Sequence, residues 1–294
     1  MSNSRQWARR AAASMAGMLA LACCPLRASG AAAPDLAAMN QPHKPFQIIG
    51  NTYYVGTAGI ASVLVTSEFG HVLVDAGLPE SAPLIAKNIE ALGFKLTDVK
   101  GIVFSHPHVD HVGGLAQLQK LTGAQIYSLR AAEEVLHTGK LPKDDPQHGV
   151  RSPAIPKIAR NWIVTDGQLL GIGSLRLRVF ATPGHTPGSA TWTWDACEGS
   201  KCLPFVYADS MNPVSADKYR FKDHPETVAA FESSLKVIES LPCELLMTPH
   251  PDAARLAKLE AAKGSADVLK EEGACRQFAQ QRREALQQRI AEGR

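Results

Sequence analysis

The chain has 294 residues, of which 45% are hydrophobic and 20% are charged, and its formal net charge at pH 7 is +3. This length and composition allow one large domain with a full hydrophobic core. The net charge is small for the length and no basic stripe stands out, which argues against nucleic acid as the main partner.

The first 30 residues have the pattern of an export signal. Basic residues precede the apolar run 11–24, and small residues follow it. A charged start, a short apolar run and a small-residue cleavage zone predict a signal peptide over residues 1–30. The run is shorter than the roughly 20 apolar residues of a membrane span, so we expect a periplasmic protein without stable membrane association. Two alternatives stay open: Arg9-Arg10 as a twin-arginine signal, and Cys23 as a lipidation site.

Residues 31–294 are predicted to form a single domain in which two strand-rich halves are each followed by helices. Short apolar or alternating runs bounded by turn residues mark the strands, and apolar residues at helical spacing mark the helices. The first half has expected strands over residues 46–49, 52–55, 61–66, 71–75, 99–104 and 124–128, with helices over 81–93 and 115–121. The second half has expected strands over residues 162–164, 175–180, 191–194, 203–207 and just before 248, with helices over 225–240 and from about 253 onward. This order predicts a sheet-on-sheet core with helices outside.

Residues 137–160 interrupt this pattern with many Pro, Asp and Lys and little periodicity. A loop of this length inside a compact domain is often functional. It either borders the active site, where Gln147 or His148 contacts substrate, or is a solvated connector.

Removal of the signal peptide leaves four cysteines, which permit three disulfide pairings. Cys197 and Cys202 flank a short loop between two expected strands, so we predict that they clamp a hairpin. This leaves Cys243 to pair with Cys275 and to tie the C-terminal helix to the domain. The closely spaced pairs of a cysteine metal site do not occur, which favours structural disulfides.

The segment His106-Pro107-His108-Val109-Asp110-His111 places four potential metal ligands within six residues, directly after an apolar strand. His106 and His108 are expected to point to the same side, because side chains alternate along an extended chain. Gly113-Gly114 is expected to allow a tight turn into the following helix. This ligand density favours a metal site over a polar surface loop, and histidine with carboxylate suits zinc.

Two further histidines follow expected strands on loops stiffened by Pro and Gly, His185 in Thr-Pro-Gly-His-Thr-Pro-Gly and His250 in Thr-Pro-His-Pro. We assign one zinc ion to His106, His108 and His185, and a second to Asp110, His111 and His250. Three protein ligands for each zinc leave a coordination position open, which is typical of catalytic sites. The other histidines lack such surroundings and are expected to be ordinary surface or half-buried residues: His43, His71, His137, His148 and His224.

The His-x-His-x-Asp-His motif, together with His185 and His250, resembles the metallo-β-lactamase superfamily over most of the mature chain. Two details resemble its third subclass of β-lactamases, the broad-spectrum two-zinc enzymes. His111 stands as a ligand where the other zinc subclasses use a cysteine of a later loop, and Ser210 lies where that cysteine would be. The resemblance implies an αββα sandwich, with two mostly antiparallel or mixed β-sheets packed face to face and helices on both outer faces.

The resemblance also implies an activity. A zinc-bound hydroxide would hydrolyse the amide bond of penicillins, cephalosporins and carbapenems, giving antibiotic resistance. Asp110 would be catalytic by orienting the hydroxide and passing a proton to the departing nitrogen. Ser210 and Asn212 would bind substrate, and Asp75 would orient a ligating histidine from behind. We expect a monomer, because no apolar helix face or heptad pattern requires a partner.

Asp209 leaves an alternative open, because an aspartate of this loop bridges the two metals in related thioester hydrolases. If Asp209 faces the metals, a lactone or thioester hydrolase is favoured; if Ser210 does, a β-lactamase is. Export and the predicted disulfides argue against a cytosolic thioester as substrate. An exported zinc-binding protein without turnover is the non-enzyme alternative, which the open coordination positions disfavour.

Overall fold

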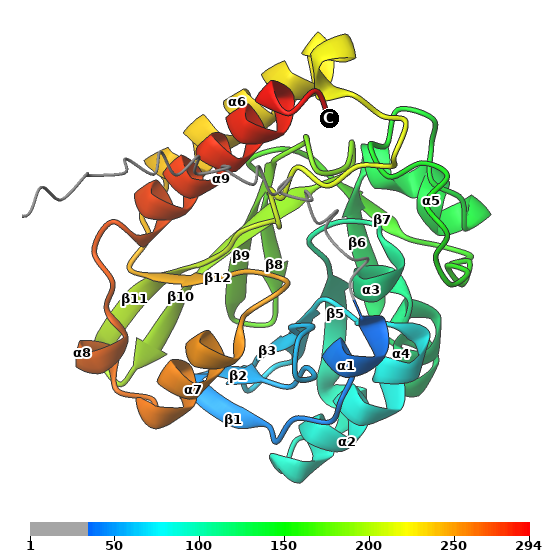
Figure 1. Ribbon diagram of the computed structural model, residues 1–294. Helices are drawn as coiled ribbons and strands as arrows, with labels where there is room; N and C mark the ends of the chain where they lie inside the picture. Colours follow the sequence, from blue (N-terminus) through cyan, green and yellow to red (C-terminus); the bar gives the residue numbers. More distant parts are fainter. Residues whose placement is uncertain (1–34) are drawn as a thin grey trace, which may run out of the picture. The chain divides into compact units, whose positions relative to one another are not determined.

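Two mixed β-sheets pack face to face in the computed structural model, which describes residues 35–294 (Figure 1). The predicted signal peptide lies outside these residues. One sheet has seven strands in the order β1 to β7, and the other has five in the order β12-β11-β10-β9-β8. The strands are β1 (Phe46–Ile49), β2 (Thr52–Tyr54), β3 (Val63–Val65), β4 (His71–Val74), β5 (Val99–Val103), β6 (Gln125–Leu129), β7 (Trp162–Val164), β8 (Leu169–Ile172), β9 (Leu175–Ala181), β10 (Ala190–Glu198), β11 (Lys201–Tyr207) and β12 (Leu245–Met247).

Helices cover the outer faces of both sheets (Figure 1). The helices are α1 (Leu36–Met39), α2 (Ala82–Ala91), α3 (Val109–Val112), α4 (Leu115–Thr122), α5 (Glu133–Thr138), α6 (Pro225–Ser240), α7 (Ala253–Ala261), α8 (Ala266–Leu269) and α9 (Ala274–Ala291). Apolar residues of α2 to α5 share a buried cluster with the seven-stranded sheet, and those of α6 and α9 share one with β11. The predicted αββα sandwich is therefore confirmed.

The core between the sheets follows from alternation along the strands. In β9, Leu175, Leu177 and Val179 point inward and the two arginines between them are exposed. Two buried tryptophans of β10 also bind across the core: the Nε1 of Trp192 donates to the backbone oxygen of Phe104 at 2.9 Å, and the Nε1 of Trp194 to Oγ1 of Thr52 at 3.0 Å. These bonds fix one sheet against the other, close to the chain segment that carries the histidine motif.

The expected elements and the observed ones agree only in part. The helix expected from about residue 253 onward is divided into α7, α8 and α9, and α5, which was not expected, covers residues 137 and 138 of the predicted loop. Helix α6 has the predicted bounds, and residues 139–161 between α5 and β7 contain no helix or strand. Strand β8 was not expected, because its exposed positions hold Leu169 and Gly171, so no polar residue alternates with the buried Leu170 and Ile172. The short helix α1 was not expected either, since its four residues are too few for a helical period to be seen.

Both predicted disulfides are present. Cys197 and Cys202 are cross-strand partners in the hairpin of β10 and β11. Cys243, two residues before β12, is bonded to Cys275 in α9. Within residues 35–294, no helix is both long enough and apolar enough to span a bilayer.

Candidate metal centre

Five strands end at one edge of the sandwich, and the predicted site residues lie in the segments that follow them. Asp75 follows β4, the histidine motif follows β5, and His185 lies between β9 and β10. Ser210 lies beyond β11, and His250 lies beyond β12. Residues far apart in the sequence therefore meet here, at the place where ligand sites of open α/β sheets usually lie.

The first predicted ligand set is assembled in the structure. His106, His108 and His185 are all buried, and each offers a ring nitrogen that lies within 4.8 Å of the others. The ring centroids are 4.5 to 5.0 Å apart. Three converging imidazoles are a donor set that suits zinc.

The second predicted set lies directly beside the first. Oδ2 of Asp110 is 3.2 Å from Nε2 of His111 and 3.2 Å from Nε2 of His250, and the two Nε2 atoms are 3.1 Å apart. His106, Asp110 and His111 also bring their donor atoms within 4.8 Å of one another, so the two sets are contiguous. Together the six residues of the two sets form the histidine cluster. The side chain of His250 is 33% exposed, which leaves this side of the cluster open to solvent.

Every histidine of the cluster uses its second ring nitrogen to bind an oxygen atom outside the cluster. A carboxylate or carbonyl oxygen only accepts hydrogen bonds, so the outer nitrogen carries a proton and the inward nitrogen is the one that can coordinate a metal. The outer contacts are His106 Nδ1 to Asp209 at 2.8 Å, His108 Nε2 to Asp145 at 3.2 Å, His185 Nδ1 to the backbone oxygen of Asn212 at 2.7 Å, His111 Nδ1 to Asp75 at 3.1 Å and His250 Nδ1 to the backbone oxygen of Gly59 at 3.1 Å.

The electrostatics of the cluster also fit a cation. Burial lowers the pKa of His106 and His185 well below the usual range, so both rings are neutral and able to coordinate. Burial works against the ionised form of Asp110, but His111 and His250 outweigh it and hold the pKa of Asp110 well below its usual value. Burial likewise disfavours charged His111, yet Asp110 and Asp75 raise its pKa to about 10. These carboxylates thus attract positive charge to the place that a metal ion would take.

Asp209 does not lie among the inward donor atoms. Its Oδ1 binds His106, its amide donates to Oγ1 of Thr191 at 3.2 Å, and burial raises its pKa to about 7. The neighbouring Ser210 is buried, and the side chain of Asn212 is exposed while its backbone oxygen holds His185. Asp209 therefore contacts the back of a ligand, and does not bridge the two ligand sets.

Asp75 is a buried acceptor for several donors, as well as for His111. Its Oδ1 accepts the backbone N–H of Ser105 at 2.6 Å, and its Oδ2 accepts Oγ of Ser105 at 2.9 Å and the hydroxyl of Tyr207 at 2.8 Å. Asp75 also has a positive φ of 59°, which an aspartate tolerates better than most residues. It joins β4, the start of the histidine motif and β11.

Some contacts of the cluster were not predicted. Asp145 lies in the 137–160 loop, and Gly59 lies between β2 and β3; neither stands in a motif. The loop does border the site, because Nε2 of Gln147 is 3.3 Å from Nδ1 of His108, whereas His148 is exposed and binds the backbone oxygen of Leu141. The only signal that pointed to Asp145 was the length of the loop that carries it.

Gly113 and Gly114 form the predicted turn between α3 and α4, but the turn does not need the conformational freedom of glycine. Both residues have helical backbone angles, with φ of −60° and −81°, so no special conformation is required. Glycine is needed for close approach: a Cβ on Gly114 would lie 2.2 Å from the backbone oxygen of Ala76, and its amide donates to Gly77 at 3.0 Å. This contact packs the start of α4 against the segment that follows Asp75.

Gly184, next to His185, is required both by its conformation and by its neighbours. Its φ is +142°, and a Cβ there would lie 2.7 Å from the ring of Phe231 in α6. We expect Gly184→Ala to lower the free energy of unfolding by about 2–4 kcal/mol, measured by urea denaturation. Gly167→Ala is the matched control, because Gly167 also has a positive φ of +74° but has open space around it, and it should cost only about 1 kcal/mol. Equal losses in the two variants would refute the role of the Phe231 contact.

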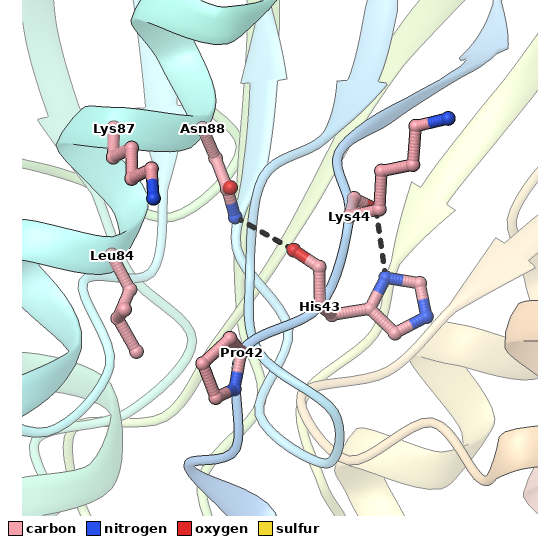
Figure 2. Close-up of a pocket in the computed structure, with 6 residues that line it drawn as sticks. All are labelled: Pro42, His43, Lys44, Leu84, Lys87 and Asn88. Atoms are coloured by element: carbon pink, nitrogen blue, oxygen red, sulfur yellow. Dashed lines mark hydrogen bonds between the residues drawn. The ribbon is translucent and has the colours of Figure 1, made fainter.

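A separate pocket lies between the segment 42–44 and α2 (Figure 2). None of its lining residues belongs to the histidine cluster, and its two lysines, Lys44 and Lys87, are exposed. The amide of Asn88 donates to the backbone oxygens of His43, Val55 and Gly56, so it joins α2 to the neighbouring segments. This pocket is a structural junction and has no contact with the predicted chemistry.

Comparisons with known proteins agree with the fold and the cluster. A family model described as the metallo-beta-lactamase superfamily matches residues 55–197. The solved structure of the metallo-β-lactamase SMB-1 bound to 2-mercaptoethanesulfonate is 44% identical with a TM-score of 0.83, covering 87% of this chain and 99% of that one. MEM-A1, a subclass B3 metallo-β-lactamase isolated from a soil metagenome library, is 41% identical with a TM-score of 0.82, covering 86% and 98%. The chain belongs to the metallo-β-lactamase superfamily.

Another group of relatives matches a shorter segment. Hydroxyacylglutathione hydrolase of Rhodopseudomonas palustris (strain BisB5) is 33% identical over 140 residues, which is 45% of this chain and 45% of that protein. The chain thus spans less than half the length of the first curated relatives that it matches. The shared part is therefore the superfamily core and does not extend over the whole of either protein.

Proposed function

We propose that this protein is a zinc-dependent hydrolase that opens the amide bond of β-lactam antibiotics, namely penicillins, cephalosporins and carbapenems. The observation that carries the proposal is the convergence of five imidazoles and one carboxylate, with each imidazole held from behind by an oxygen atom. The metallo-β-lactamases SMB-1 and MEM-A1 support the substrate class, because the chain covers nearly all of each at more than 40% identity.

The donor set fits two zinc ions. His106, His108 and His185 would hold one, and Asp110, His111 and His250 would hold the other. When bound, zinc polarises the substrate carbonyl and lowers the pKa of water to about 7, which makes a nucleophile available at neutral pH. Magnesium and calcium prefer oxygen ligands, so this imidazole-rich set favours zinc over them.

The residues of the chain supply position and proton transfer. Oδ2 of Asp110 faces His111 and His250, so Oδ1 is left to take a proton from the attacking water and to pass it to the departing amide nitrogen. Ser210 and Asn212 are proposed to bind the substrate beside the cluster. Asp75 and Asp209 hold His111 and His106 in their orientations, so the inward nitrogens need no rearrangement during turnover.

The position of Asp209 favours β-lactams over the alternative. A lactone or thioester hydrolase is the second candidate, because hydroxyacylglutathione hydrolases are among the relatives of the core. In those enzymes an aspartate of this loop is expected between the metals, whereas here Asp209 binds His106 from behind. We therefore assign the contact with substrate to Ser210 and not to Asp209.

A chromogenic cephalosporin assay with and without a chelator tests the proposed function. We expect turnover that is lost on chelation and restored by zinc. Zinc binding without cephalosporin, penicillin or carbapenem turnover would contradict the proposal, and a panel of lactones and thioesters would then test the second candidate. Bound zinc without turnover of any of these would favour a zinc-binding protein that is not an enzyme.

His250→Ala tests the division of the ligands. Because His250 contacts Asp110 and His111, its loss should empty mainly the second site and reduce the zinc content from two ions per chain to one. Elemental analysis of the purified variant measures this content directly. His224→Ala is the control, since His224 lies outside the cluster and should leave two ions bound. Two zinc ions retained in His250→Ala would refute the ligand assignment.

The two disulfides support an oxidising compartment. We propose that the protein acts in the periplasm as a monomer, with residues 1–30 removed on export, and that its partner is the small-molecule substrate. Mass spectrometry of the mature protein from a periplasmic fraction would locate the cleavage site. A mature chain that begins at lipidated Cys23 would contradict removal of residues 1–30.

A further inference from the structure

We propose that Asp145 is a positioning residue that fixes the tautomer of His108, so that Nδ1 of His108 faces the first metal position. This inference rests on the proposed metal centre and names a residue of the 137–160 loop as part of it. His108 differs from the other four histidines of the cluster, because its outward nitrogen is Nε2 and theirs is Nδ1. A dedicated partner is therefore needed on the Nε2 side.

The carboxylate of Asp145 meets this ring with both oxygens. Oδ2 lies 3.2 Å and Oδ1 lies 3.3 Å from Nε2 of His108. The Asp145 side chain is fully buried, and that of His108 is 9% exposed. A carboxylate can only accept here, so Nε2 carries the ring proton and Nδ1 keeps its lone pair.

A second neighbour independently indicates the same tautomer. The side-chain nitrogen of Gln147 lies 3.3 Å from Nδ1 of His108. An amide NH₂ group only donates hydrogen bonds, so it requires an acceptor lone pair on Nδ1. An acceptor on one side of the ring and a donor on the other therefore select the Nε2–H form, which is the form that coordinates through Nδ1.

The backbone around Asp145 holds the carboxylate rigidly. The amide of Gln147 donates to Oδ1 of Asp145 at 2.8 Å, and the amide of Asp145 donates to the backbone oxygen of Pro142 at 3.2 Å. The next residue, Pro146, accepts the amide of Ala216 at 2.8 Å. Ala216 belongs to the same segment as Asn212, whose backbone oxygen holds His185. Two ligands of the first set thus depend on two loops that are bonded to each other.

The test compares Asp145→Leu and Asp145→Asn with Asp144→Asn in the zinc-loaded protein. Asp144 is the exposed neighbour and has no contact with the cluster, so its variant controls for charge in the loop. Asp145→Leu removes the acceptor at similar volume, and we expect zinc affinity of the first site to fall about 10–100-fold, measured by competition with a chromogenic chelator. Asp145→Asn keeps one acceptor oxygen and should lose less zinc affinity at the first site. Asp144→Asn should bind zinc with the affinity of the parent protein.

A spectroscopic readout separates positioning from a general structural effect. Two-bond proton–nitrogen NMR correlations report which ring nitrogen carries the proton. In protein stripped of zinc, where the metal does not itself fix the ring proton, we expect the Nε2–H form of His108 in the parent protein and in Asp144→Asn, and a mixture of forms in Asp145→Leu. An unchanged tautomer or an unchanged first-site zinc affinity in folded Asp145→Leu would overturn the proposal. If that variant does not fold, unchanged affinity in Asp145→Asn together with an Nδ1–H tautomer in the parent would overturn it. Failure of the β-lactam assay would not overturn this proposal, because the two readouts measure only zinc affinity and the tautomer of the His108 ring.

Discussion

Asp110→Asn is expected to lower kcat/KM for a chromogenic cephalosporin by about 10²–10⁴-fold, the usual contribution of a positioned acid or base. The amide has the same shape as the carboxylate but does not take up the proton that Oδ1 is proposed to transfer. It also removes the negative charge that lies 3.2 Å from both His111 and His250. Steady-state kinetics in excess zinc, together with the zinc content of the variant, separate lost proton transfer from lost metal.

The control for this experiment is again Asp144→Asn, which changes the same functional group on an exposed loop. It should retain the activity of the parent protein within about twofold, since surface substitutions away from such features are usually nearly neutral. If Asp110→Asn retains more than a tenth of the parent activity with both zinc ions bound, Asp110 is not the proton carrier and the mechanism is wrong.

The histidine motif could be read from the sequence because its ligands are local. Four of them lie within six residues after one apolar strand, and the loops of His185 and His250 have the same Pro-rich context. The metal ligands could therefore be predicted without knowledge of the fold, but prediction of the oxygen atoms that bind their outer nitrogens needed it. Asp145 is 37 residues from His108, Asp209 is 103 from His106, and Gly59 is 191 from His250. Such pairs form when segments distant in the sequence pack together, within one sheet's half of the fold for Asp145 and across the two sheets for Asp209 and Gly59, and they carry no local pattern.

For the fold as well, some features could be predicted from the sequence and others could not. Helix α6 and strand β9 were visible because their apolar residues repeat with a clear period, whereas only residues 191–194 of β10 and 203–207 of β11 were predicted, because the burial of these two strands does not alternate regularly. The choice between Asp209 and Ser210 was not visible, because adjacent side chains after a strand can face either way. In the structure, Thr191 and His106 bind the backbone and the side chain of Asp209, which turns its carboxylate to the outer nitrogen of a ligand.

Asp75→Ala is expected to destabilise the protein even more than Gly184→Ala does. It leaves the N–H and Oγ of Ser105, the ring of His111 and the hydroxyl of Tyr207 without their acceptor, and Asp75 itself is fully buried. An unsatisfied buried donor costs about 1–3 kcal/mol, and losses within one network are not additive. We expect the free energy of unfolding to fall by about 3–5 kcal/mol in urea with excess chelator, so that metal binding does not contribute.

Asp75→Gly is the variant that identifies the cause of this loss. The backbone of Asp75 has a φ of 59°, so alanine there adds conformational strain, whereas glycine adopts this angle freely. If the carboxylate is responsible, glycine and alanine should destabilise the protein equally within about 1 kcal/mol, and both should weaken zinc binding through His111. Tyr207→Phe removes a single donor and should cost only about 0.5–1.5 kcal/mol. Recovery of most of the stability in Asp75→Gly would show that backbone strain, and not the shared acceptor, explains the alanine variant.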